Sequence, residues 1–200
     1  MLAEFFGIMM GDGGINNLWQ ITITLNAVAD ARYARRVSGL CKKLFGVSPS
    51  VRRRKESKTL VISLASTSVV DFLISQGLPR GDKIKNGIKV PDWILGKLLY
   101  QKACLRGLVD TDGCLFIHKH RVLGNLYKNI GLSFRNCSPN LIFWVATTLE
   151  ELGIMAHITS RGSDVCIYQA DAVVKYLKVV GTSNSRIELV YKKWRDARAV

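Results

Sequence analysis

The sequence predicts an α+β protein made of two pseudo-symmetric αββαββα halves, each with an antiparallel sheet, packed together through two similar helices. The first observation is a repeat: EFFGIMMGDGGI at 4–15 returns as CLRGLVDTDGCL at 104–115. The second is that each copy is followed by the same order of strand and helix patterns. Internal repeats of this kind decide the architecture before single elements are considered.

The first half carries the order most clearly around its first long strand. Over 18–26, Ile21, Ile23 and Leu25 alternate with polar residues, which is the period of a half-buried strand. Asp30 then favours the N-cap of a helix that Gly46 ends. Two further strands over 51–54 and 59–64 and a helix over 68–76 complete this half.

The second half repeats these elements with small shifts in spacing. It predicts strands over 114–122 and 129–136, a helix over 139–153 capped by Ser138, strands over 154–161 and 164–170, and a helix over 172–180. A stretch rich in Gly, Pro and Lys separates the halves. We therefore expect a first repeat over 1–78, a linker over 79–95 and a second repeat over 96–200.

Composition restricts the classes of partner. The chain has 200 residues, 48% of them apolar, and a formal net charge of +14. Such a charge favours a polyanionic partner, nucleic acid before membrane. No apolar stretch reaches the roughly 18 residues of a membrane span, so we expect a soluble, intracellular protein. Its five scattered cysteines contain no CxxC pair, which favours a reducing compartment and argues against structural zinc.

The two repeated segments place small residues and acids in matching positions. Gly7 and Gly11 lie one helical turn apart, as do Gly107 and Thr111. Small residues at this spacing let two helices approach closely, which would bring the aspartates at 12 and 112 side by side. Two adjacent carboxylates need a cation, and hard oxygen ligands suit Mg²⁺. A single copy would indicate only a helix that leads into a hairpin, but two matching copies favour a shared site.

FFGIMMGDG (5–13) and LRGLVDTDG (105–113) resemble the nine-residue motif of the LAGLIDADG homing endonucleases, in the single-chain form with two copies. The flanking order of elements is similar across nearly the whole chain. The resemblance implies that the two sheets form a saddle on double-stranded DNA. It also implies that the protein is a monomer and a site-specific endonuclease that cuts both strands and leaves short 3′ overhangs.

The resemblance also implies the metal ligands. The last acid of each motif, here Asp12 and Asp112, would bind Mg²⁺ at the scissile phosphates, helped by the carbonyls of Gly11 and Thr111, and Ca²⁺ or Mn²⁺ would substitute there. The metals would then activate water and stabilise the leaving oxygen, the two-metal route of phosphodiester hydrolysis. The earlier acidic position is Asp110 in the second motif and Met10 in the first, which we interpret as a packing or capping difference.

Basic and polar residues near the motifs are further candidates for catalysis. The family places a basic residue after the last helix of each repeat, which Lys83 or Lys85 and Arg186 would fill. A surface lysine is the alternative for each lysine. Asn26 and Asn136, near the ends of corresponding strands, would position water.

The strand pattern sorts the residues that would face DNA. In the first half they are Gln20, Thr22 and Thr24, and in the second half Ser133 and Arg135, together with His118 and His120, which share one strand face while Leu115 and Ile117 pack inward. The His pair would bind metal only with a third ligand, so we interpret it as DNA-facing. Arg52, Arg54 and Arg161 lie in predicted hairpins, either as solvated phosphate contacts or within reach of bases.

Three alternatives concern proteins of the same fold. A regulator that binds DNA without cutting it would have lost the motif acids, yet both are present. A maturase that binds intron RNA stays open, because a basic surface also suits RNA. A nuclease embedded in an intein would need flanking splicing blocks, which we do not find. A prokaryotic cytoplasm and an organelle both fit the sequence.

Overall fold

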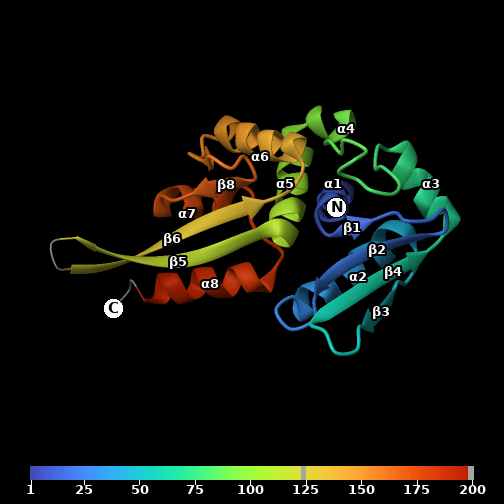
Figure 1. Cartoon of the computed structure of the whole chain (residues 1–200), viewed down its shortest axis with the longest axis horizontal. Coiled ribbons are helices and arrows are strands. Elements are labelled where there is room, and N and C mark those ends of the chain that lie inside the picture. The colour runs from blue at the N-terminus through green and yellow to red at the C-terminus, as the bar shows by residue number, and fades with distance from the viewer. Residues whose placement is uncertain (123–124, 198–200) are drawn as a thin grey trace.

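The computed structural model describes residues 1–122 and 125–197, without the side chains of His120, Val122 and residues 125–127. Each half contributes one four-stranded antiparallel sheet (Figure 1). The first has the order β1-β2-β4-β3, with β1 (Gly13–Gly14), β2 (Gln20–Asn26), β3 (Ser50–Arg53) and β4 (Thr59–Ala65). The second has the order β5-β6-β8-β7, with β5 (Gly113–Val122), β6 (Asn125–Arg135), β7 (His157–Ile158) and β8 (Asp164–Ile167). The identical order confirms the predicted repeat.

Helices follow the strands in both halves. They are α1 (Leu2–Gly11), α2 (Ala31–Phe45), α3 (Thr67–Ser75), α4 (Asp92–Leu95), α5 (Leu98–Asp112), α6 (Pro139–Glu151), α7 (Ala170–Val179) and α8 (Ser185–Asp196). The α+β fold is thus confirmed, whereas α4 and α8 were not predicted. Among the described helices, none combines the length and the apolar character that crossing a membrane requires.

The helices α1 and α5 lie side by side at the centre of the molecule, as the glycine spacing predicts (Figure 1). A Cβ atom on Gly7 would lie 2.8 Å from the backbone N of Leu108, and one on Gly107 would lie 2.9 Å from the backbone N of Ile8. Only glycine therefore allows the two backbones to approach this closely. Both motif aspartates are placed by this contact.

The start of α2 lies where the sequence predicts. Asp30 does occupy the N-cap position, but its side chain makes no capping hydrogen bond. One of its carboxylate oxygens accepts instead from Asn184 (2.9 Å) and from Arg186 (3.2 Å), which belong to the other half of the chain. Gly46 ends α2 in the left-handed conformation, with a φ of 70°, as predicted.

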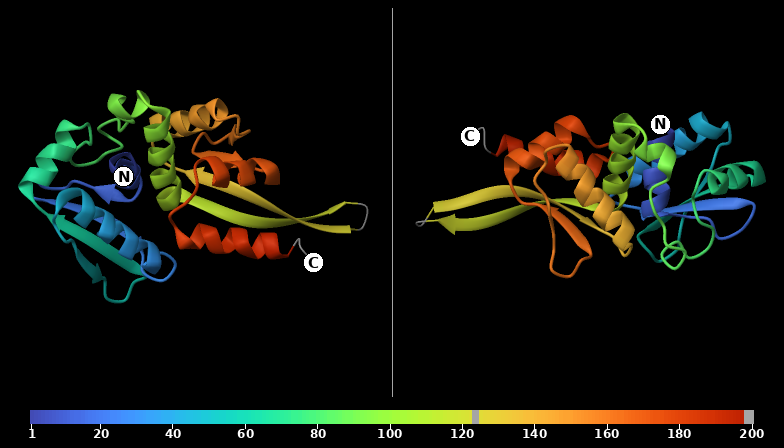
Figure 2. Two further views of the ribbon diagram at one scale, coloured as in Figure 1. Left: turned by 180° about the vertical axis from the view of Figure 1, so that it is seen from behind. Right: turned by 90° about the horizontal axis from the view of Figure 1, so that it is seen from above.

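The hairpin of β5 and β6 extends well beyond the rest of the second half (Figure 2). Ile117 lies on the same strand face as Leu115, but it is 38% exposed while Leu115 is buried. The expected inward packing of Ile117 is therefore wrong, because the strand has run past the helices that cover Leu115. The halves otherwise share one core, which includes residues of α1 and α5.

Candidate functional site

The two motif aspartates stand at the ends of the packed helices. Asp12 is the C-cap of α1, where its N–H donates to the Ile8 carbonyl (3.1 Å), and Asp112 is the last residue of α5. A Cβ atom on Gly11 would lie 3.3 Å from the Oδ2 atom of Asp112, so the end of one helix adjoins the acid of the other. The structure thus places both carboxylates in one region, between the two sheets.

The pKa of both carboxyl groups is raised in this position. Burial, with the neighbouring charge of Asp112 as the next cause, raises the pKa of Asp12 to about 7. Burial also raises the pKa of Asp112, against the lowering effect of a hydrogen bond from Asn136 and of the charge of Lys83. Two partly buried acids that repel each other are the setting in which a divalent cation stabilises the charged forms.

Asn136 holds Asp112 directly. Its Nδ2 atom donates to Oδ2 of Asp112 at 2.7 Å, and its Oδ1 atom accepts from the Ser138 amide at 2.8 Å. The expected counterpart, Asn26, does not lie at the other aspartate. Its Oδ1 atom accepts instead from the amides of Val28 and Ala29 in the turn after β2. The register explains the error, because Ile23 pairs with Gly13 as Phe134 pairs with Gly113, which makes Leu25 the equivalent of Asn136.

Lys83 reaches the end of the first motif. Its Nζ atom donates to the carbonyl of Gly11 and, at 3.0 Å, to that of Gly13. Burial lowers its pKa, while the charges of Asp112 and Asp12 act in the opposite direction. Lys85 is exposed, and its backbone amide donates to Asp82. Of the two predicted lysines, the structure brings Lys83 to the aspartates.

Arg186 occupies the corresponding place in the second half. One terminal nitrogen donates to the Gly113 carbonyl (3.1 Å), and its Nε donates to Asp30 (3.2 Å). Lys83 and Arg186 therefore each bond the glycine that follows a motif aspartate. The match supports the predicted placement of one basic residue in each half.

The earlier acid of the second motif, Asp110, stabilises the chain before α8. It is fully buried and accepts from the Thr182 hydroxyl and from the Ser183 amide (2.7 Å). Burial raises its pKa to about 7. Met10 at the matching position of the first motif is buried among apolar residues. This geometry agrees with a packing and capping role away from the metal ligands.

The first sheet has a polar face, as the strand pattern predicts. Ile21, Ile23 and Leu25 are buried, while Gln20 and Thr22 are half-buried and Thr24 is exposed. Val61 pairs with both Thr24 and Arg52, which places these two side chains on the same face. Arg54 follows one residue after β3 and is exposed. The predicted DNA-facing residues of this half thus share one surface.

The second sheet also has a mixed polar face. His118 lies there, half-buried, beside the ring of Phe116, and Ser133 pairs with Cys114. Arg135 forms an ion pair of 2.6 Å with Asp164, its cross-strand neighbour, so part of its charge is already balanced. Arg161 is exposed in the turn between β7 and β8. The side chain of His120 lies outside the described residues.

Three functional candidates were missed from the sequence. Asn184 is fully buried and joins the halves, because its Nδ2 atom donates to both Asp30 and the Asp110 carbonyl. Asp164 and His157 lie on the second sheet's polar face: Asp164 pairs with Arg135, and His157 pairs with Cys166, which itself pairs with Ser133. Only strand register identifies the last two. Asn184 stands directly before α8 as its N-cap, where its Oδ1 atom accepts from the Arg186 amide, and an N-cap asparagine is the signal that could have found it.

The ligand set fits a hard divalent cation. The carboxylates of Asp12 and Asp112 and the carbonyl of Gly11 present oxygen donors, while Thr111 keeps its hydroxyl bonded to the carbonyls of Gly107 and Leu108. Within 1–122 and 125–197, no group of three or more His, Cys, Asp and Glu side chains could hold a metal. Such a centre would thus need carbonyl, water or phosphate oxygens beside the two carboxylates.

Comparisons with solved structures place the fold. The meganuclease I-SmaMI bound to uncleaveable DNA superposes with a TM-score of 0.62 at 11% identity, over 94% of this chain and 87% of that one. Variants of the homing endonuclease I-DmoI give a TM-score of 0.58 at 16% identity, over 89% and 93%. Full-length DUF199/WhiA from Thermatoga maritima gives 0.60 at 14% identity, over 96% and 59%.

Sequence comparisons are weaker. No family model matches the chain. A tRNA-splicing ligase RtcB of Methanopyrus kandleri is 31% identical over 127 residues, 56% of this chain, and one of Pyrococcus abyssi is 28% identical over 201 residues, 92% of this chain. The chain spans only 13% and 21% of the length of these relatives. The comparisons therefore show that this chain has the fold of structurally known homing endonucleases.

Proposed function

We propose that this protein is a site-specific endonuclease that cleaves both strands of a DNA duplex and uses a divalent metal ion, preferably Mg²⁺. The observation that carries the proposal is the meeting of Asp12 and Asp112 at the ends of two helices packed through Gly7 and Gly107. Two related acids at one molecular centre match two scissile phosphates on opposite strands.

The proposal includes a divalent metal ion because two neighbouring carboxylates in this site favour a bound cation. Asp12, with a pKa raised to about 7 by burial and by Asp112, needs a cation to hold its charge at neutral pH. Neighbouring structures of I-DmoI were solved with DNA and Mn or with DNA and Ca. We infer that Asp12, Asp112 and the carbonyls of Gly11 and Thr111 hold the ion. A bound Mg²⁺ would supply Lewis acidity and a more acidic water at the phosphate.

The chain's own residues would orient this centre. Asn136 fixes Asp112 through a 2.7 Å hydrogen bond. Lys83 brings a cation to the end of the first motif, where it would offset charge that develops on the phosphate. Arg186 is held by Asp30 and the Gly113 carbonyl and would act in the same way in the second half.

DNA would lie along the polar faces of the two sheets. Thr22, Thr24 and Arg52 present hydroxyl and guanidinium groups from the first sheet, and Ser133 and Arg135 present theirs from the second. Such groups bind base edges and phosphates. The net charge of +14 favours association with any duplex.

The test is selection from a library of randomised duplexes. Wild-type protein is incubated with Mg²⁺ or Ca²⁺, and the cut ends and the bound uncut molecules are sequenced. The matched variants are Asp12→Asn and Asp112→Asn, which remove one charge each at constant size.

We expect cuts on both strands of one long site with Mg²⁺ and none in either variant. Selection of a site without cleavage would overturn the endonuclease proposal and favour a DNA-binding regulator. Selection of no site would overturn DNA as the partner and favour the maturase alternative.

A further inference from the structure

The exposed face of α2 carries positive charge near both its ends. At helical spacing it presents Arg32, Arg35, Arg36, Lys42 and Lys43, which we call the α2 basic stripe. The helix contains no acidic residue. From Arg32 to Lys43 the stripe runs about 17 Å at 1.5 Å per residue. Arg36 pairs with Glu4 at 3.5 Å, and Lys42 and Lys43 suit the C-terminal turn of the helix. Arg32 repels Arg36 four residues away, so the fold does not explain the whole set.

The corresponding helix of the other half shows that the fold does not require this stripe. Helix α6 follows β6 as α2 follows β2, and it contains no Lys or Arg. Its exposed residues include Asn140, Phe143, Glu150 and Glu151. If the basic stripe were part of the packing, α6 would need one too. The charge on α2 therefore points to a ligand of the first half alone.

The stripe faces away from the proposed DNA surface. Tyr33, Val37 and Cys41 turn the opposite side of α2 toward the core, where Ile21 and Ile23 of β2 are also buried. Thr22 and Thr24 point to the other side of that sheet. Helix α2 thus covers one side of the sheet (Figure 2). The alternation along β2 places the polar residues on the other side. A duplex bound along the polar faces leaves the stripe free.

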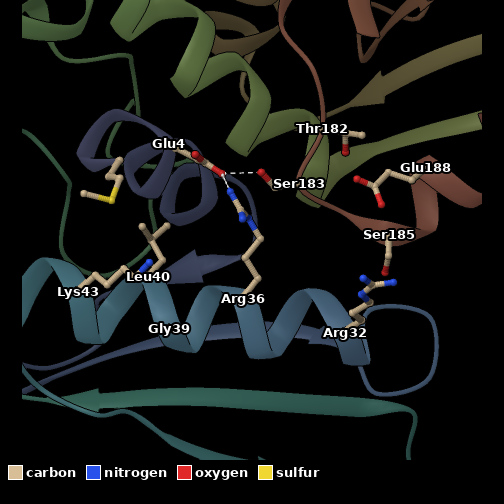
Figure 3. A pocket seen from close by; sticks show the side chains of 11 residues that line it. Glu4, Arg32, Arg36, Gly39, Leu40, Lys43, Thr182, Ser183, Ser185 and Glu188 are labelled. Carbon is tan, nitrogen blue, oxygen red and sulfur yellow. Dashed lines mark hydrogen bonds and ion pairs between the residues drawn. The ribbon is translucent and has the colours of Figure 1, made fainter.

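A cleft of about 570 Å³ adjoins the stripe, between α2 and the segment that leads into α8. Arg32, Arg36 and Lys43 line one side, and Thr182, Ser183 and Ser185 line the other (Figure 3). The hydroxyl groups of Thr182 and Ser183 already donate to Asp110 and Glu4. The three cationic side chains, with the hydroxyl of Ser185 opposite them, are groups that bind phosphate oxygens.

The acids of the cleft do not cancel this charge. Glu4 is neutralised by Arg106 at 2.9 Å and accepts from Ser183 at 2.9 Å, while Arg36 approaches it at 3.5 Å with its side chain still 56% exposed. Burial raises the pKa of Glu4, but the hydrogen bond and charge of Arg106 outweigh it, so the pKa lies below its usual value. Glu188 remains as one exposed acid in a cleft that three basic side chains line.

We propose that the α2 basic stripe and its cleft bind the sugar-phosphate backbone of a second nucleic-acid strand, while the sheets bind duplex DNA. The contacts are to phosphates, so they do not distinguish one base sequence from another. This site does not depend on cleavage, and it stands whether or not the sheets cut the duplex.

Two triple variants of equal charge change test the proposal. The first, Arg35→Gln with Lys42→Gln and Lys43→Gln, changes the stripe and leaves Arg36 with Glu4. The second, Arg52→Gln with Arg53→Gln and Arg54→Gln, changes β3 and the residue after it. All six side chains are exposed, so both variants keep the core. The probes are a fluorescent single-stranded RNA, a single-stranded DNA of the same sequence and a duplex, each titrated at several salt concentrations.

We expect the stripe variant to bind the single-stranded probes about tenfold more weakly, with a salt slope lower by about 2, since each lost phosphate contact on a single strand lowers it by about 0.7. The β3 variant should bind the duplex more weakly than the wild type and bind the single-stranded probes equally well. Equal loss for both single-stranded probes identifies phosphate alone as the ligand, and loss for RNA only adds the 2′-hydroxyl. Unchanged binding in the stripe variant, or equal loss in both variants, would overturn the proposal.

Discussion

At the residue scale, the protonation of buried carboxylates links the site to stability. Asp12 has a pKa of about 7 in the folded chain, against an ordinary value near 4, because of burial and the neighbouring Asp112. The folded state therefore binds more protons than the unfolded state between about pH 4 and pH 7. The contribution of the Asp12 carboxyl to the free energy of unfolding is present below that pH range and is lost as pH rises through about 7.

The pH dependence of unfolding checks this account. In the absence of metal, we expect the free energy of unfolding by urea to fall between pH 5 and pH 8, and to fall less steeply in Asp12→Asn. The slope should decrease without vanishing, because Asp110 also has a pKa near 7 and remains in the variant. An identical slope in Asp12→Asn would show that Asp12 titrates normally.

Asn136 and Asn26 form a matched pair of residues, one at the site and one away from it. Asn136→Ala removes the hydrogen bond to Asp112, and we expect Mn²⁺ affinity and DNA cleavage to fall about 10- to 100-fold, as for other residues that orient a metal ligand. Asn26→Ala removes only the bonds to the turn at Val28 and Ala29, with a loss of stability of about 1 kcal/mol. Isothermal titration and a cleavage assay measure both, and equal cleavage by the two variants would refute the role of Asn136.

At the element scale, the contact between α1 and α5 rests on glycine. We expect Gly7→Ala to lower the free energy of unfolding by about 1–3 kcal/mol, because the new Cβ would lie within 3 Å of the α5 backbone and the helices must shift. Gly39→Ala on α2 is the control, since an added Cβ there has no neighbour within 4 Å. It should raise stability by about 0.5–1 kcal/mol. Thermal and urea unfolding compare the two, and a neutral Gly7→Ala would contradict the close packing.

Element types were predictable from sequence where periodicity was strong. The alternation of Ile21, Ile23 and Leu25 identified β2, and the repeated glycines identified the helix pair. Register was not predictable, because it depends on pairing between strands far apart in the chain; the wrong assignment of Asn26 follows from this. Helix α8 was also not predicted. Asn184 caps its start, but the burial of Ile187 and Trp194 that stabilises it depends on contacts with distant segments of the second half.

At the scale of the whole molecule, the halves are joined by a polar network as well as by apolar packing. Glu4 of α1 is bonded to Arg106 of α5 and to Ser183 before α8, and Asn184 bridges Asp30 and Asp110. These contacts lie between distant segments and have no pattern along the chain, so the sequence could not reveal them. They tie α1 and α5, which carry the two motif aspartates, to the segment before α8.

Glu4→Gln tests this coupling. In the wild type, Arg106 is the main group that holds the pKa of Glu4 below its usual value, against the effect of burial. The stabilisation by the Glu4 carboxylate is therefore present at neutral pH and is lost as pH falls through the folded pKa. We expect the variant to lose about 1–3 kcal/mol of unfolding free energy at pH 7 and less in acid. Glu188→Gln, an exposed acid, should change little. A variant as stable as wild type at pH 7 would show that the network does not couple the halves.

The central claim is that Asp12 and Asp112 share a divalent-metal centre on DNA. The most direct measurement is anomalous X-ray scattering from Mn²⁺ in crystals of the protein with its selected duplex. We predict anomalous density within about 2.6 Å of carboxylate oxygens of both aspartates, with the carbonyls of Gly11 and Thr111 as further ligands. Density elsewhere, or none at the two aspartates, would contradict the account.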